Sequence, residues 1–195
     1  MSVVQLKTHD SVVGMKFKPA DKMRTMRWHA VGGLCLINGY RKGAELGVSQ
    51  GRFTMFLCAI MHDMEMIAVD LWAEQEVREG VECAETYSGW DHEGNYQRFK
   101  QNCAEYFAGR VDIRRMDSSS AAASVEDESL DFVFVDADHT YEGAKRDIEA
   151  WLPKVRLGGM LCGHDYNWPP VKKIVDEKFP ERGLMSDNVW VHFRK

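Results

Sequence analysis

Apolar and polar positions follow two different periods along this chain of 195 residues. Short apolar runs alternate with segments in which apolar residues recur every three to four positions, a pattern typical of strands and amphipathic helices respectively. The runs that predict strands are Arg41 to Leu46, Met66 to Val69, Val111 to Arg115, Phe132 to Val135, Met160 to Cys162 and Val189 to Phe193. The segments that predict helices are Ala20 to Asn38, Phe53 to Ile60, Tyr96 to Phe107, Tyr141 to Leu152 and Val171 to Phe179.

Strands that alternate with helices predict an α/β fold with right-handed crossovers. We therefore expect a three-layer α/β/α sandwich with a Rossmann-like, mostly parallel sheet and a C-terminal antiparallel strand. The run from Phe132 to Val135 is apolar at consecutive positions, as in a central strand. Residues 41–195 should form one domain, and residues 1–40 an N-terminal arm and helix packed on it. Ser49 is the expected N-cap of the second helix.

Composition describes an ordinary soluble globular protein, with 45% hydrophobic and 28% charged residues. The net charge of −5 argues against a nucleic-acid partner, which normally meets a basic surface. The first 42 residues nevertheless hold eight Lys/Arg against two Asp. This basic segment could meet an anionic substrate, although a solvated helix face is the simpler interpretation.

The five cysteines are widely spaced and never form Cys-x-x-Cys, so they predict neither a disulfide framework nor a zinc site. That usage fits a reducing cytoplasm, where we expect the protein to lie. The N-terminus mixes charged and apolar residues, unlike a signal peptide, and no apolar run approaches the length of a membrane span.

Chemically active side chains follow several predicted strands. Asp70 ends the second strand, Asp136 and His139 follow the central one, and His164 and Asp165 follow the next. Because ligands bind beyond the carboxyl ends of parallel strands, these groups should meet at one edge of the sheet.

A glycine turn, Glu45-Leu-Gly47-Val-Ser49-Gln-Gly51, joins the first strand to the next helix. It is not a dinucleotide fingerprint, because Glu45 takes the first glycine position and would repel a pyrophosphate. An acid there suits a ligand with positive charge. Asp70, about 20 residues after this turn, occupies the position at which Rossmann-type folds bind the two hydroxyls of a ribose. The alternative interpretations are a turn required only for packing and an N-cap at Asp70.

Taken together, these motifs resemble those of class I S-adenosylmethionine-dependent methyltransferases, and most closely the small-molecule or sugar O-methyltransferase branch with DxDHxYE and GHDY motifs. The resemblance covers roughly residues 40–195. The family loop usually has a middle glycine, which Ser49 replaces here. The motifs that carry it are Glu45-x-Gly47-x-x-x-Gly51, Asp70, Met116-Asp117-Ser118, Asp136-Ala-Asp138-His139 and Gly163-His164-Asp165-Tyr166.

The resemblance implies S-adenosyl-L-methionine as the cofactor, held along this edge. Its methionine and sulfonium end would lie against the segment from Glu45 to Gly51, and its ribose hydroxyls against Asp70. Asp117 would accept a hydrogen bond from the adenine amino group, and the Ser118 backbone N–H would donate to the ring. The residues implied in cofactor binding are Glu45, Gly47, Ser49, Gly51, Asp70, Leu71, Asp117, Ser118 and Asp136.

Two alternatives stay open for the acceptor side. Metal-dependent O-methyltransferases of the catechol type place acidic ligands after strands 4 and 5, which implies a metal site at Asp136, His164 and Asp165. Mg²⁺ prefers oxygen ligands, whereas His164 suits a softer ion. Without a metal, Asp138, His139 and His164 would form an acid–base cluster that removes a proton from the acceptor.

The function expected from the resemblance is methylation of a hydroxyl group on a small-molecule acceptor. A nicotinamide-dependent oxidoreductase is disfavoured by Glu45, and a cofactor-binding module without catalysis is the alternative from another class. A nucleic-acid methyltransferase would need the basic N-terminal segment at the cofactor edge. Residues 71–95, acidic and aromatic, are either an acceptor wall or a surface excursion. The oligomeric state stays open, with a homo-oligomer as one option.

Overall fold

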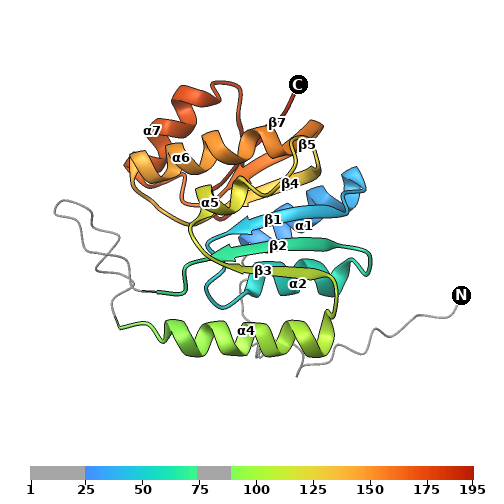
Figure 1. Ribbon diagram of the computed structural model, residues 1–195. Coiled ribbons are helices and arrows are strands. Elements are labelled where there is room, and N and C mark those ends of the chain that lie inside the picture. The colour runs from blue at the N-terminus through green and yellow to red at the C-terminus, as the bar shows by residue number, and fades with distance from the viewer. Residues whose placement is uncertain (1–24, 74–88) are drawn as a thin grey trace, which may run out of the picture.

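A seven-stranded sheet forms the centre of the computed structural model, which describes residues 25–73 and 89–195 (Figure 1). The strand order is β3-β2-β1-β4-β5-β7-β6. Strands β1 to β5 pair in parallel, and β7 is antiparallel to both β5 and β6. The strands are β1 (Lys42–Leu46), β2 (Glu65–Asp70), β3 (Val111–Arg115), β4 (Leu130–Val135), β5 (Val155–Gly163), β6 (Gly183–Met185) and β7 (Val189–Phe193).

Helices cover both faces of the sheet, which confirms the predicted three-layer α/β/α sandwich (Figure 1). One layer holds α1 (Arg27–Asn38), α2 (Arg52–Ile60) and α4 (His92–Tyr106). The other holds α5 (Ser118–Ala122), α6 (Tyr141–Trp151) and α7 (Pro169–Lys178), with a short 3-10 turn (Leu152–Lys154) after α6.

Alternation along the central strand divides the core into two halves. Phe132 and Phe134 of β4 pack into the layer of α1, α2 and α4, whereas Val133 and Val135 pack into the layer of α5, α6 and α7. All four are buried, as the run of consecutive apolar residues predicted for a central parallel strand. The edge position predicted for the strand Val111–Arg115 is also confirmed.

Some element ends differ from the predictions. The first helix begins at Arg27, and residues 20–24 lie outside the described part of the chain. Ser49 is not the N-cap of α2, because Gly51 takes that place in a left-handed conformation with φ of 73°. Strand β5 begins at Val155, five residues earlier than expected, since its first half includes Gly158 and Gly159, which hide the strand pattern.

The turn between β6 and β7 is hydrogen-bonded to two other segments of the chain. The backbone N–H of Arg27, at the start of α1, donates to Oδ2 of Asp187 at 2.9 Å. The backbone N–H of Tyr166, in the loop after β5, donates to the carbonyl of Asn188 at 3.1 Å. The start of α1 and the loop after β5 are therefore held by the same turn.

Cys35, Cys58, Cys103 and Cys162 are buried and not disulfide-bonded, and Cys83 lies outside the described residues. None of the helices described is long and apolar enough to cross a membrane.

Candidate active site

A cavity of about 890 Å³ lies at the carboxyl ends of β1, β2 and β4. Every residue predicted for the site except Gly51 lines this cavity. The sheet topology therefore brings the predicted residues to one edge. Those that line the cavity are Glu45, Gly47, Ser49, Asp70, Leu71, Asp117, Ser118, Asp136, Asp138, His139, His164 and Asp165.

The two glycines of the turn after β1 are required by close packing. Gly47 has φ of 86°, and a Cβ there would lie 2.0 Å from the carbonyl oxygen of Asp136. Gly51 has φ of 73°, and a Cβ there would lie 2.0 Å from the ring of Phe99. Gly47 thus lets the turn after β1 approach the end of β4, whereas Gly51 packs against α4.

Glu45 is a buried carboxyl group in the cavity wall, only 3% exposed. Its Oε2 accepts hydrogen bonds from the backbone N–H of Thr54 at 3.1 Å and from the Thr54 hydroxyl at 2.5 Å. Burial raises the pKa of Glu45 to about 8, although the Thr54 hydrogen bonds oppose this rise. A cationic ligand beside Glu45 would favour its charged form.

Asp70 is the last residue of β2, and its carboxyl group accepts a hydrogen bond from the turn after β1. Its Oδ2 accepts from the backbone N–H of Ser49 at 2.7 Å, and its Oδ1 from the backbone N–H of Trp72 at 2.6 Å. The Trp72 indole N–H donates to the Ser49 carbonyl at 2.8 Å. Trp72 is 1% exposed and packs against Tyr96, whereas Leu71 is 41% exposed and lines the cavity.

Asp117 caps the short helix α5. Its Oδ1 accepts from the Ser119 hydroxyl at 2.5 Å and from the backbone N–H of Ser120 at 3.0 Å. The Ser119 hydrogen bond is the main cause that holds the pKa of Asp117 below its usual value. Asp117 is therefore an anion at the cavity wall.

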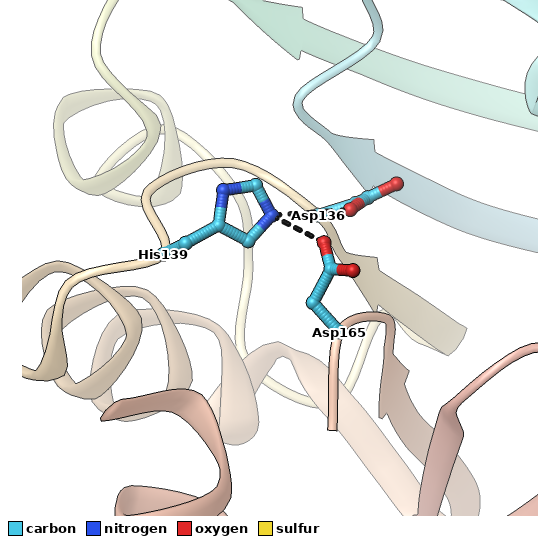
Figure 2. Close-up of side chains that lie close together, drawn as sticks. All are labelled: Asp136, His139 and Asp165. Atoms are coloured by element: carbon cyan, nitrogen blue, oxygen red, sulfur yellow. Dashed lines mark ion pairs between the residues drawn. The ribbon is translucent and has the colours of Figure 1, made fainter. Parts of the chain in front are cut away.

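The loops after β4 and β5 bring two carboxylates to one imidazole, as Figure 2 shows. Nε2 of His139 lies 2.7 Å from Oδ2 of Asp165 and 3.5 Å from Oδ1 of Asp136. Burial lowers the pKa of His139, but the hydrogen bonds to both carboxylates outweigh it and raise the pKa to about 10. The same contacts hold the pKa of both carboxyl groups below the usual value, against the effect of burial.

His164 contacts the same two carboxylates and also Arg27 of α1. Nδ1 of His164 is 3.0 Å from Oδ1 of Asp165 and 3.6 Å from Oδ1 of Asp136. Nη1 of Arg27 lies 3.1 Å from both ring nitrogens of His164, and Nε of Arg27 lies 3.4 Å from Oδ2 of Asp136. Two carboxylates thus face two imidazoles and one guanidinium.

Asp138 lies on the α6 side of this cluster. Its Oδ1 accepts from the backbone N–H of Thr140 at 2.9 Å, and its Oδ2 is 3.7 Å from Nη2 of Arg146. A Cβ on Gly143 would lie 2.0 Å from the Asp138 carboxyl carbon, so the side chain packs closely on the first turn of α6. Asp138 is a partly exposed carboxylate within the cavity.

Asp136, His139 and Asp165 could hold a metal ion, because one ligand atom from each lies within 4.8 Å of the others. The predicted set had His164 where this group has His139. Two carboxylates and an imidazole form a mixed oxygen and nitrogen donor set, which fits a transition metal better than Mg²⁺.

Among the cavity residues that were not predicted for the site, Arg27 and Asp147 are a charged group and a buried acid. Arg27 belonged to the basic N-terminal segment, and the structure places it in the cavity rather than on a solvated helix face. Asp147 is a buried acid on α6. The sequence carried a signal for its burial, because apolar residues lie three and four positions away along the predicted helix, on the same face. Of the predicted acceptor wall, residues 74–88 lie outside the described chain, but Trp90 and His92 line the cavity.

Solved structures share this fold. A Staphylococcus aureus protein described as a candidate caffeoyl-CoA O-methyltransferase aligns with a TM-score of 0.62 and 18% identity, over 89% of this chain and 85% of its own. An O-methyltransferase from Bacillus cereus, solved in complex with SAH, aligns with a TM-score of 0.57 and 16% identity, over 89% and 82% of the two chains. At these identities the likeness establishes the fold.

Sequence comparison adds a relative and a family. The uncharacterized protein y4gI of Sinorhizobium fredii is 28% identical over 143 residues, which are 70% of this chain, but the match spans only 14% of that longer protein. A family model described as a methyltransferase domain matches residues 44–166, from β1 to the loop after β5. Because this match covers more than half of the chain, the protein belongs to the methyltransferase-domain family, in agreement with the family expected from its motifs.

Proposed function

We propose that this protein transfers the methyl group of S-adenosylmethionine to a hydroxyl group of a small molecule or sugar. The observation that carries the proposal is a single cavity that joins the turn after β1 to the acid–base cluster after β4 and β5. Methyl transfer needs the donor sulfur, the methyl carbon and the acceptor oxygen in line, so both groups of residues must face the same space.

The cofactor would lie along β1, β2 and α5. Its positive charges suit the Glu45 side, where a cationic ligand offsets the cost of a buried carboxylate. Asp70 would receive the ribose hydroxyls, and Asp117 and Ser118 the adenine edge. The SAH-bound structure from Bacillus cereus, which has the same fold, supports this class of ligand.

The acceptor would lie beside Asp138, His139 and His164. In the reaction its oxygen bonds to the methyl carbon, the carbon–sulfur bond breaks, and the sulfur leaves as a neutral thioether. The hydroxyl proton passes to a base, and we assign this role to Asp138, with the two histidines as hydrogen-bond donors to the oxygen. In the alternative with a metal, a divalent ion held by Asp136, His139 and Asp165 would replace the hydrogen bond from His139 and would supply positive charge that lowers the pKa of the acceptor hydroxyl.

The proposal also assigns a role to each part of the chain and a class of binding partner. Residues 41–195 would be the cofactor-binding domain, and the preceding segment would add Arg27 to its acceptor side. The cavity wall carries several carboxylates, including Asp117, Asp136 and Asp165, which disfavours a polyanion such as nucleic acid.

The test combines binding with turnover. Calorimetric titration with S-adenosylhomocysteine should show binding, and Asp70→Ala should weaken it by about 1–3 kcal/mol, the usual cost of lost polar partners. Transfer of labelled methyl should then be screened over catechols and sugars, and Asp138→Asn should abolish it while cofactor binding persists. Binding without turnover of any acceptor would favour the non-catalytic module instead. Absence of binding would contradict the proposal as a whole.

A further inference from the structure

Arg27, the first residue of α1, brings a permanent positive charge to the acid–base cluster. Its backbone N–H donates to Asp187 at 2.9 Å, so the start of the helix fixes the point from which this side chain extends. The side chain is 31% exposed and lines the cavity, so it borders the space in which the acceptor would lie. An arginine side chain stays protonated in proteins and has only N–H donors, so it acts here as a fixed cation.

The two oxygens of Asp136 have different neighbours. Oδ1 faces the imidazoles, at 3.5 Å from Nε2 of His139 and 3.6 Å from Nδ1 of His164. Oδ2 lies 3.4 Å from Nε of Arg27. The Asp136 side chain is only 11% exposed, and a carboxylate buried to this extent requires a partner of opposite charge. Arg27 supplies that charge in every protonation state of the two imidazoles.

Arg27 and a divalent ion would share Asp136. The candidate metal ligands are Asp136, His139 and Asp165 (Figure 2), and Arg27 pairs with the first of them. An ion bound there would lie on a carboxylate whose charge the guanidinium already neutralises, and two cations on one carboxylate repel each other at short range. Arg27 should therefore weaken the binding of an ion, and a bound ion should weaken the pairing of Arg27 with Asp136.

We propose that Arg27 is the resident cation of this cluster, which pairs with Asp136 in place of a divalent ion and donates hydrogen bonds to the acceptor oxygen as that oxygen loses its proton. The position of the acceptor beside His139 and His164 rests on the proposed function. A guanidinium stabilises a developing oxyanion by its charge and its N–H groups, which is the contribution that a metal ion makes in the alternative. Divalent ions then compete with Arg27 for the cluster, and methyl transfer does not require them.

The first experiment measures Mn²⁺ affinity by electron paramagnetic resonance at one pH, for the wild type, Arg27→Gln, Arg27→Lys and the matched control Arg52→Gln, after thermal melts show that each is folded. Arg52 is exposed at the start of α2 and lines the same cavity, but it forms no ion pair with the described residues. Arg27→Gln should bind Mn²⁺ at least about 10-fold more tightly than the wild type, because it removes a cation from the shared carboxylate. Arg27→Lys keeps the charge, so its affinity should stay closer to that of the wild type, as should that of Arg52→Gln.

Methyl transfer to an acceptor found in the screen gives a second readout. The wild type should be active in EDTA. Arg27→Gln should lose about 100-fold in kcat under the same conditions, the usual effect of removing one oxyanion donor, and should recover when Mn²⁺ is added. A wild type that is inactive in EDTA, or a variant that keeps its kcat there, would overturn the role given to Arg27 at the acceptor oxygen.

The affinities decide the competition without reference to the cofactor. Equal Mn²⁺ affinity in the wild type and Arg27→Gln, or no binding to either, would refute it. An equal gain in Arg52→Gln would attribute the effect to the general charge of the cavity and would overturn it as well. If S-adenosylhomocysteine does not bind, the proposed function fails, while the Mn²⁺ measurements still show whether Arg27 excludes an ion from Asp136. Should Arg27→Gln not fold, Arg27→Met removes the same charge and keeps an unbranched side chain.

Discussion

At the scale of the residue, the cavity contains a carboxyl group whose protonation in the folded protein differs from that in the unfolded chain. The pKa of Glu45 is raised from 4.5 to about 8, mainly by burial, with Asp136 adding to the rise and Arg27 opposing it. A raised pKa means that folding favours the protonated form. The contribution of Glu45 to stability is therefore fully present below pH 4.5 and is lost as the pH rises through about 8.

We accordingly predict that, in the cofactor-free protein, Glu45→Gln removes the loss of folding stability that accompanies the rise in pH. At pH 8.5 the variant should exceed the wild type in free energy of unfolding by about 2–4 kcal/mol, and at pH 4 the two should be equal. Urea unfolding across this pH range measures the difference. Glu65→Gln, which changes an exposed carboxyl group on the adjacent strand, is the control and should show no such trend. A difference for Glu45→Gln that does not vary with pH would contradict the prediction.

Gly47 allows the backbone of the turn after β1 to lie against the backbone that follows β4. A methyl group at this position would collide with the Asp136 carbonyl and would also require a left-handed conformation. Gly47→Ala should therefore lower the free energy of unfolding by at least about 2 kcal/mol and weaken binding of S-adenosylhomocysteine. Gly33→Ala in α1, where a Cβ meets nothing within 4 Å, should be neutral or stabilising by about 0.5–1 kcal/mol. Similar effects of the two substitutions in thermal melts would rule out the packing role.

At the scale of the element, the turn between β6 and β7 links α1 to the loop after β5. Loss of the Asp187 carboxylate would leave the Arg27 backbone N–H at the start of α1 without its acceptor. We expect Asp187→Ala to cost about 1–2 kcal/mol and to speed hydrogen exchange in the first turn of α1. Asp63→Ala, which removes an exposed partner of Arg41, should leave that exchange unchanged. Wild-type protection of α1 in Asp187→Ala would show that the turn does not anchor the helix.

Elements were predictable where their own residues carry the signal. The periodic stripe at Phe53, Phe56 and Leu57 and the apolar run of β4 identified α2 and the central strand. The start of α2 was not predictable, because the choice of Gly51 over Ser49 depends on the ring of Phe99 in a distant helix. Helix α5 has five residues, too few for a period, and is fixed largely by Asp117, Asp147 and Trp151.

At the scale of the whole molecule, the parallel sheet made most of the site predictable. Residues that follow β1, β2, β4 and β5 had to share one edge once the strand order was that of an open parallel sheet. Arg27 and Asp147 could not be found in this way, because they reach the cavity from helices, and their positions depend on how α1 and α6 pack. The sequence thus predicts the edge of the site but not the groups that the two helical layers add.

The stability of the whole protein should also report whether the cluster after β4 and β5 binds a metal ion. Ligand atoms of Asp136, His139 and Asp165 lie within 4.8 Å of one another, and the imidazole among them favours a transition metal over Mg²⁺. Since an ion that binds only the folded state stabilises it, Mn²⁺ should raise the melting temperature more than Mg²⁺ at equal concentration, and EDTA should reverse the effect. Asp165→Asn should abolish the increase, whereas Asp63→Asn, remote from the cluster, should retain it. If neither ion changes the melting temperature, then the two carboxylates contact only the imidazoles and Arg27, and the cluster is an acid–base network without a metal. If Mg²⁺ acts as strongly as Mn²⁺, the site binds an ion but the imidazole does not select a transition metal.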